Sequence, residues 1–105
     1  MNSTRDTVMN DLVPSEFFLS QNYPNPFSGK TTIKFCVAYK TKVKLEVFNS
    51  EGKMIKKLLD EEKEAGTYEV EFQSVVSSRQ LASGVYDYQM EAGDFLTRKK
   101  MTLLR

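Results

Sequence analysis

From Thr31 onward, apolar and polar residues of this 105-residue chain alternate in short segments. A period of two is typical of β-strands that bury one face, because successive side chains of a strand point to opposite sides. Turn residues separate the segments, and no convincing helical pattern interrupts them. The residues that share one face of their segments are Ile33, Phe35 and Val37; Val43, Leu45 and Val47; Tyr68, Val70 and Phe72; Tyr86, Tyr88 and Met90; and Phe95, Thr97, Met101 and Leu103.

Seven short strands are predicted, at residues 17–21, 31–37, 42–47, 53–59, 68–72, 84–91 and 95–105. The fourth breaks phase, because Ile55 and Leu58 are three residues apart, and this spacing indicates a β-bulge. The same segment could form one helical turn, but a strand is favoured because both its neighbours are strands. Seven alternating strands bury their apolar faces most economically as an antiparallel sandwich of two sheets, so the fold class is all-β.

The connections between these strands carry turn signals. Asn49–Gly52 predicts a hairpin in which Gly52 is free to take positive φ. Asp60–Gly66 is predicted to be a charged turn, and residues 73–83 a longer polar loop. Gly84 opens the sixth strand, where we expect positive φ or a close backbone approach. The apolar residues of the long loop are predicted to plug the core: Val75, Val76 and Leu81.

The segment Asn22–Gly29 predicts a stiff, non-helical corner. Its two Asn/Pro units consist of Asn22, Pro24, Asn25 and Pro26. Proline fixes φ and pushes the preceding residue toward extended geometry, while asparagine side chains close local turns. The corner could also be a recognition surface, but turn geometry accounts for every one of these residues, so a structural role is favoured.

Composition excludes several chemistries. The chain has no His, which rules out His-based triads, His general bases and His metal ligands. Its single cysteine, Cys36, allows no internal disulfide and no cysteine-cluster zinc site. With 15 basic and 14 acidic residues, the net charge of +1 gives no overall attraction to nucleic acid or an anionic membrane. We expect no enzyme activity, no cofactor, no metal and no direct membrane insertion.

The remaining candidate sites favour ordinary structural roles. The acids of the Asp60–Gly66 turn could bind calcium, but they lack the regular spacing and inner glycine of a calcium loop. Glu69 and Glu71 project from one strand face, whereas paired catalytic carboxylates need a cleft. Cys36 lies on the parity opposite the core, either partly covered on the outer face or exposed enough for chance dimerisation, with nothing to activate its thiol.

Residues 1–16 are polar and aperiodic, and they predict a linker that precedes the folded part, residues 17–105. The first residues lack the apolar stretch of a secretory signal, so the chain at face value would stay in the cytosol of the producing cell. That expectation fails if the chain is a piece of a longer precursor.

Six motifs identify a known family when they are taken together and in order: Gln21–Phe27, Thr31–Phe35, Val43–Gly52, Ala65–Tyr68, Ser83–Tyr88 and Lys99–Arg105. From about Leu19 to its last residue, the chain resembles the C-terminal sorting domain of the type IX (Por) secretion system. The resemblance implies an immunoglobulin-like β-sandwich at the end of a longer precursor.

The same resemblance implies a route for the precursor. It passes through the periplasm, and the outer-membrane type IX translocon recognises the sorting domain. A sortase-like cysteine protease then removes the domain, and the upstream cargo is released or anchored at the cell surface. The family's recognition information lies at the C-terminal end, which here comprises Lys99, Lys100, Met101, Leu103, Leu104 and Arg105, preceded by Arg98. The structural motifs are carried by Asn22, Pro24, Asn25, Pro26, Gly52, Gly66, Gly84 and Tyr86.

Within the terminal segment, Met101 and Leu103 are expected to face the interior, while Lys99, Lys100 and Arg105 stay solvated. An ordinary last strand with a charged, solubilising face would have the same sequence pattern. The resemblance favours the other interpretation, in which the terminal segment docks on a receptor. The alternative function is a sandwich that stays on the mature protein for adhesion or carbohydrate binding. Tyr86 and Tyr88 could then stack on a sugar, although their shared parity with the core favours packing. Edge strands of an open sandwich could also pair two copies into a dimer.

Overall fold

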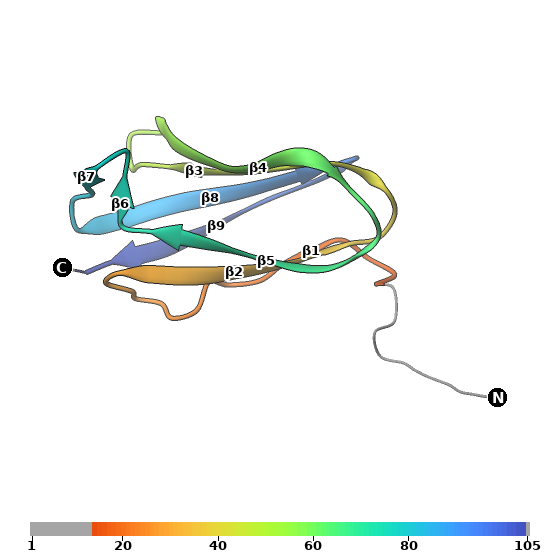
Figure 1. Ribbon diagram of the computed structural model, residues 1–105, viewed down its shortest axis with the longest axis horizontal. Helices are drawn as coiled ribbons and strands as arrows, with labels where there is room; N and C mark the ends of the chain where they lie inside the picture. Colours follow the sequence, from red (N-terminus) through yellow and green to blue (C-terminus); the bar gives the residue numbers. More distant parts are fainter. Residues whose placement is uncertain (1–13, 105) are drawn as a thin grey trace.

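Nine β-strands and no helix make up residues 14–104, the part of the chain that the computed structural model describes (Figure 1). The strands are β1 Phe18–Leu19, β2 Lys30–Val37, β3 Thr41–Phe48, β4 Met54–Lys63, β5 Gly66–Gln73, β6 Val75–Val76, β7 Arg79–Gln80, β8 Gly84–Ala92 and β9 Phe95–Leu103. One sheet has the order β1-β2-β5 and the other β4-β3-β8-β9, while β6 and β7 pair with each other. All these pairings are antiparallel.

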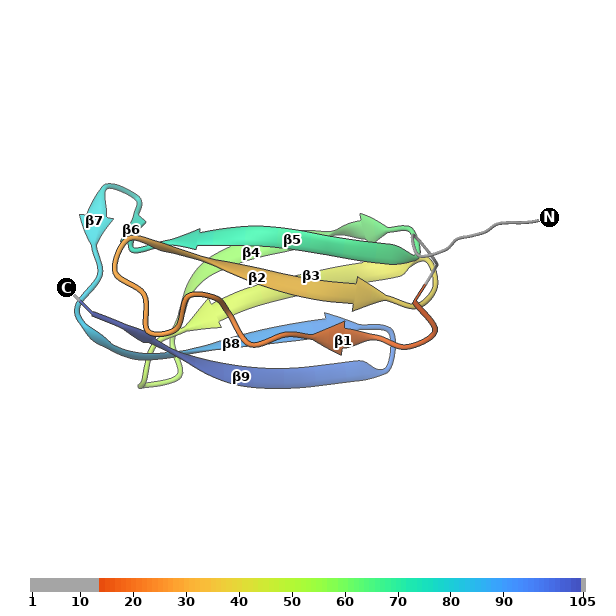
Figure 2. The same ribbon diagram turned by 90° about the horizontal axis from the view of Figure 1, so that it is seen from below.

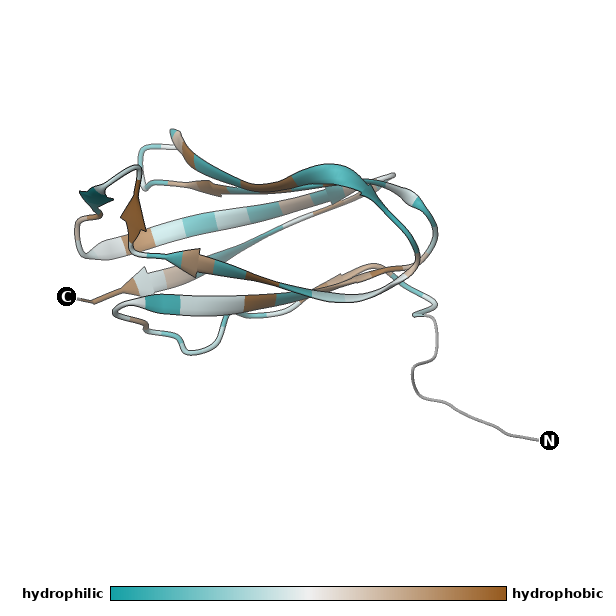
Figure 3. Cartoon of the chain, in the orientation of Figure 1, coloured by the Kyte–Doolittle hydropathy of each residue, from teal (hydrophilic) through white to brown (hydrophobic). Residues whose placement is uncertain are grey.

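The two larger sheets pack face to face with their apolar residues between them, and apolar and polar residues alternate along the strands (Figure 2, Figure 3). The strand order is that of an immunoglobulin-like sandwich, so the predicted fold class is confirmed. Most of the predicted inward residues are almost completely buried, on the edge strands β5 and β9 as well as on the central strands. They are Ile33, Phe35 and Val37; Val43, Leu45 and Val47; Phe72; Tyr86, Tyr88 and Met90; and Met101 and Leu103.

Strand β4 departs from the predictions at its C-terminal end. It continues to Lys63, so the predicted charged turn over Asp60–Gly66 is wrong in its first half. Residues 60–63 pair with the start of β3, where the ammonium of Lys42 lies 3.4 Å from the carboxylate of Asp60. Because β4 is an edge strand, its charged side chains stay in water while its main chain completes the ladder.

The predicted irregularity of β4 is confirmed. Its pairing with β3 shifts register between Leu45 and Glu46 and again between Val47 and Phe48. The loop after β5 contains the short strands β6 and β7, which the sequence did not predict. In that loop Val76 and Leu81 pack against the core as expected, but Val75 is 48% exposed and does not plug it.

Gly52 and Gly84 both have positive φ, a backbone conformation that other residues rarely adopt. Gly52 has φ of +85° in the turn between β3 and β4, where its amide donates to the Asn49 carbonyl at 2.9 Å. The side-chain oxygen of Asn49 also accepts from the Glu51 and Lys53 amides, at 3.0 and 2.9 Å. Gly84 has φ of +150° where the chain enters β8, which confirms the expectation for both glycines.

Gly84→Ala is expected to lower the free energy of unfolding by about 1–3 kcal/mol, because a Cβ atom strains this backbone conformation. Space is not the cause, since a Cβ here would meet no atom within 4 Å. Gly29→Ala is the matched control, because that site is equally open and its φ lies outside the left-handed region. It is expected to be neutral or to stabilise by up to about 1 kcal/mol. Urea denaturation measures the free energy of unfolding of both variants. Equal changes at the two sites would contradict a role for the positive φ of Gly84.

Candidate docking surface around the last strand

Strand β9 forms one edge of the four-stranded sheet, next to β8 (Figure 1). Met101 and Leu103 are fully buried between the sheets, as the sequence predicted. Lys100 and Leu104 are exposed. The strand therefore contributes to the core with one face and presents its other face to solvent.

On the exposed face of β8 and β9, two cations surround the carboxylate of Asp87. Asp87 lies 3.0 Å from the ammonium of Lys100 and 3.5 Å from the guanidinium of Arg98. Arg98 also donates to Gln89 at 2.9 Å and lies over the ring of Phe48, 4.6 Å from its centroid. Two cations therefore share one carboxylate at this point, while Glu91 on the same face of β8 is paired with Lys44 on β3 at 3.8 Å.

Lys99 does not lie where the sequence analysis placed it. It shares the parity of Met101 and Leu103 and is half-buried, so the expectation that it stays solvated beside Lys100 is wrong. Strand alternation is the cause, since neighbouring residues point to opposite faces. Arg105 lies outside the described residues.

The corner Asn22–Phe27 packs along the outer edge of β9, where the segment between β1 and β2 passes beside it (Figure 2). The Thr102 amide donates to the side-chain oxygen of Asn25 at 2.9 Å, and the Thr102 carbonyl accepts from the Phe27 amide at 3.0 Å. The Leu104 amide donates to the Phe27 carbonyl at 2.8 Å. The side chain of Gln21 donates to the Lys100 carbonyl at 2.6 Å.

These contacts were missed in the sequence analysis, which explained the corner by turn geometry alone. That explanation holds locally, because the buried Asn22 side chain donates to the Pro24 carbonyl and to the Thr31 hydroxyl, at 3.1 and 3.0 Å. The bonds to β9 join residues more than seventy positions apart, and no local pattern reveals them.

Tyr88 anchors the start of the corner to the core. Its hydroxyl donates to the Ser20 carbonyl at 2.7 Å and accepts from the Asn22 amide at 2.8 Å. Burial raises the pKa of Tyr88 to about 12, against the opposing effect of the Asn22 amide. Tyr86 is also buried and donates to the Ala82 carbonyl at 2.6 Å, so the favoured core packing of both tyrosines is confirmed.

The acidic candidates are surface groups. Glu69 and Glu71 lie 3.8 and 3.5 Å from the ammonium groups of Lys34 and Lys30 on the neighbouring strand β2. The pKa of the Asp60 carboxyl is lowered, chiefly by its hydrogen bond with Lys57 and also by Lys42, while desolvation opposes the shift. Across residues 14–104, no group of three or more His, Cys, Asp or Glu side chains could hold a metal ion.

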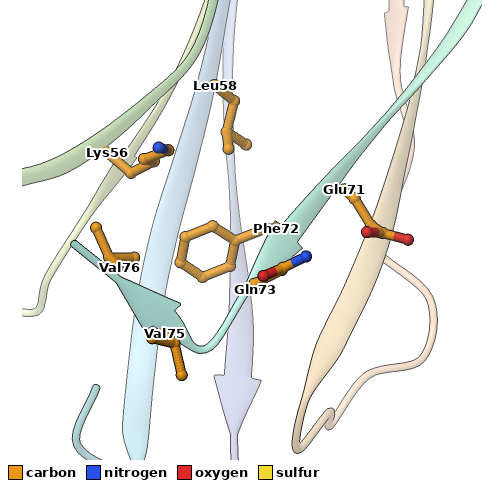
Figure 4. Close-up of a pocket in the computed structure, with 7 residues that line it drawn as sticks. All are labelled: Lys56, Leu58, Glu71, Phe72, Gln73, Val75 and Val76. Carbon is orange, nitrogen blue, oxygen red and sulfur yellow. The ribbon is translucent and has the colours of Figure 1, made fainter. Parts of the chain in front are cut away.

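Two further features carry no chemistry. Cys36 is partly exposed on the outer face, and its Sγ lies 3.7 Å from the Thr67 hydroxyl. A cavity of about 280 Å³ lies between edge strands β4 and β5, on the side of the sandwich away from β9. Leu58, Phe72 and Val76 point toward one another there (Figure 4).

Within the described part of the chain, no helix is long and apolar enough to cross a membrane.

Comparison with known proteins identifies a family. The model of the family described as "Secretion system C-terminal sorting domain" matches residues 21–103. This match includes all of β2–β9 and the corner that covers β9. Comparison with curated proteins gives no match.

The sandwich is also found in a solved structure, dimeric latent PorU from Porphyromonas gingivalis. The TM-score is 0.64 at 16% sequence identity, and the match covers 96% of this chain but 10% of the PorU chain. This chain is thus similar in fold to about a tenth of that protein. A second match is the Pseudomonas fluorescens alkylpurine DNA glycosylase AlkC, at TM-score 0.47 and 13% identity over 87% of this chain and 31% of that one.

Tyr88→Phe is expected to lower the free energy of unfolding by about 1–3 kcal/mol near neutral pH, because it leaves the buried Asn22 amide and the partly buried Ser20 carbonyl without this partner. The folded protein holds the Tyr88 proton more tightly than an unfolded chain, where a tyrosine pKa is about 10. This contribution is present below pH 10 and is lost as the pH rises toward about 12. The stability difference between the native protein and Tyr88→Phe should therefore narrow over that interval. Denaturant titrations at each pH check this, with exposed Tyr23→Phe as the control; a constant difference would contradict it.

Asn25→Ala is expected to speed hydrogen exchange of the Thr102 amide about tenfold, because it removes the acceptor that covers this edge of β9. The Leu104 amide keeps its bond to Phe27 and should exchange as before. Asn49→Ala is the control, since it removes a similar acceptor in a distant turn. Hydrogen exchange measured by NMR tests this prediction. An unchanged exchange rate of the Thr102 amide in Asn25→Ala would show that the corner does not protect the strand.

Proposed function

This chain belongs to the family of secretion system C-terminal sorting domains, and we propose that its strand β9 is the part that the translocon recognises. Membership of this family makes the chain an outer-membrane export signal for the cargo that bears it. The domain then acts as a binding module with no chemistry of its own. The proposed recognition segment comprises Lys99, Lys100, Met101, Leu103, Leu104 and Arg105, joined by Arg98. Its exposed residues would contact the receptor, while the buried Met101 and Leu103 hold the strand in place.

The observation that supports this proposal is the division of β9 into two faces. Met101 and Leu103 are buried, so they stabilise the strand and are not available to a receptor in the folded domain. Arg98 and Lys100 lie on the exposed face and share one carboxylate. A folded receptor surface with acidic groups can contact these cations directly, and such complementarity favours fast and specific encounter.

The domain boundary is part of the proposal. Phe17 packs against Tyr39 and Phe95, with ring centroids 4.9 and 5.8 Å apart. These contacts support a folded unit that begins near Phe17 and a linker to the cargo at residues 1–16. In this proposal a sortase-like cysteine protease cuts the linker after transit through the periplasm and outer membrane, which leaves the cargo secreted or anchored at the cell surface.

Replacing Lys99, Lys100 and Arg105 together with Gln is expected to reduce export of a fused reporter while leaving the domain folded. Stability should change by no more than about 0.5 kcal/mol at the exposed Lys100, and Gln keeps part of the aliphatic stem at the half-buried Lys99. The matched control replaces Lys53, Lys56 and Lys57 near the opposite edge, which removes the same charge and should leave export unchanged. Reporter secretion in a type IX-competent host and circular dichroism of the purified variants are the two measurements.

Leu103→Ala separates folding from recognition. It should lower the free energy of unfolding by about 2–4 kcal/mol through lost burial and a cavity, and so impair export by unfolding the domain. If the folded variant with all three Gln replacements is exported normally, the translocon does not recognise the basic side chains. Failure of the native fusion to be exported would contradict the sorting function itself.

A further inference from the structure

The outer edge of β9 is covered over only half of its length. Residues of an antiparallel strand alternate, so that one set bonds to the neighbour on one side and the next set to the other side. Lys100 and Thr102 direct their main-chain groups away from β8, as their bonds to Gln21, Asn25 and Phe27 show. Leu96 and Arg98 have the same parity, so their main-chain groups also point away from β8.

The first half of this edge is open. In the described part of the chain, no hydrogen bond is made to the main chain of Leu96 or Arg98 from outside the β8–β9 ladder. Leu96 is 63% exposed, and the side chain of Arg98 is 44% exposed. A row of unpaired amides and carbonyls is a template on which another strand can pair. We call the stretch Leu96–Arg98 the open edge.

A second copy of the chain is a poor occupant for the open edge. Pairing two such edges about a twofold axis at Arg98 would place Arg98 opposite Arg98, with Lys99 and Lys100 close by on both strands. Like charges directly opposite each other in a ladder are destabilising, and cationic side chains are a common protection of edges against self-pairing. Of the acids on the exposed face of β8, Asp87 is already shared by Arg98 and Lys100. Glu91, the cross-strand partner of Leu96, is paired with Lys44 on β3 at 3.8 Å.

We propose that the open edge receives an extended, acidic segment of the translocon as an additional antiparallel strand. Main-chain pairing with Leu96 and Arg98 would supply the contact, and acidic side chains of the incoming strand would lie beside Arg98 and Lys100. This proposal rests on the sorting function and specifies how the signal is read. The corner limits the docking register, because the edge beyond Lys100 is already occupied by Asn25 and Phe27.

Arg98→Pro tests main-chain pairing, because it removes the outward amide without removing a donor of the β8 ladder, and proline is tolerated at an edge of this kind. Arg98→Gln is the matched variant that loses the charge and keeps the amide. We expect folded Arg98→Pro to lower export of a fused reporter about tenfold and Arg98→Gln to lower it less. Folded Arg98→Pro exported at the native level would overturn the proposal, whereas failure of the native fusion would overturn the sorting function.

A second measurement uses the native protein alone and does not depend on the folding of a variant. The isolated ¹⁵N-labelled chain is titrated with a capped peptide of alternating Val and Glu, and amide exchange is followed by NMR. We expect the Leu96 and Arg98 amides to exchange freely in the protein alone and to become protected with this peptide, but not with its Val–Lys counterpart. Protection by both peptides alike, or by neither, would contradict an acidic strand at this edge. A dimer in sedimentation equilibrium with Arg98 already protected would assign the edge to a second copy.

Discussion

Every main-chain group at the edge of a sheet must find a partner or remain in water, and β9 meets this constraint in two ways. Its second half is bonded by the corner, through the side-chain oxygen of Asn25 and the main chain of Phe27. Its first half is left to solvent and to cationic side chains. The hydroxyl of Tyr88 holds the start of the corner in place, so the covered half of the edge depends on a bond made inside the core.

The alternation in the sequence predicted most of the fold, because a period of two follows directly from the geometry of a buried sheet face. Met101, Leu103 and both core tyrosines lie where it placed them. The same rule would have placed Lys99 on the inward side, but the basic run from Arg98 to Lys100 was interpreted as one solvated cluster. The alternation of a strand determines which way each side chain points, even where neighbouring residues carry the same charge.

Other features could not be predicted from local pattern. The charges from Asp60 to Lys63 suggested a turn, yet an edge strand accepts them because its side chains remain in water while its main chain pairs with β3. The bonds from Asn25 to Thr102 and from Gln21 to Lys100 join the two ends of the chain. Turn propensity explains why Asn25 suits a corner, but only the packing of the sandwich decides which strand the corner covers.

In our proposal the same strand supplies both stability and recognition, so the mode of docking matters for an export signal. The open edge is an ordered row of donors and acceptors only while Met101 and Leu103 hold β9 in the sandwich. An unfolded terminal segment would carry the same charges without that row. A receptor that pairs with the edge would therefore bind the folded domain in preference to the unfolded chain, and its binding would stabilise the sandwich by mass action. A receptor that responds to charge alone would not make this distinction, so the mode of docking determines whether export depends on folding of the domain.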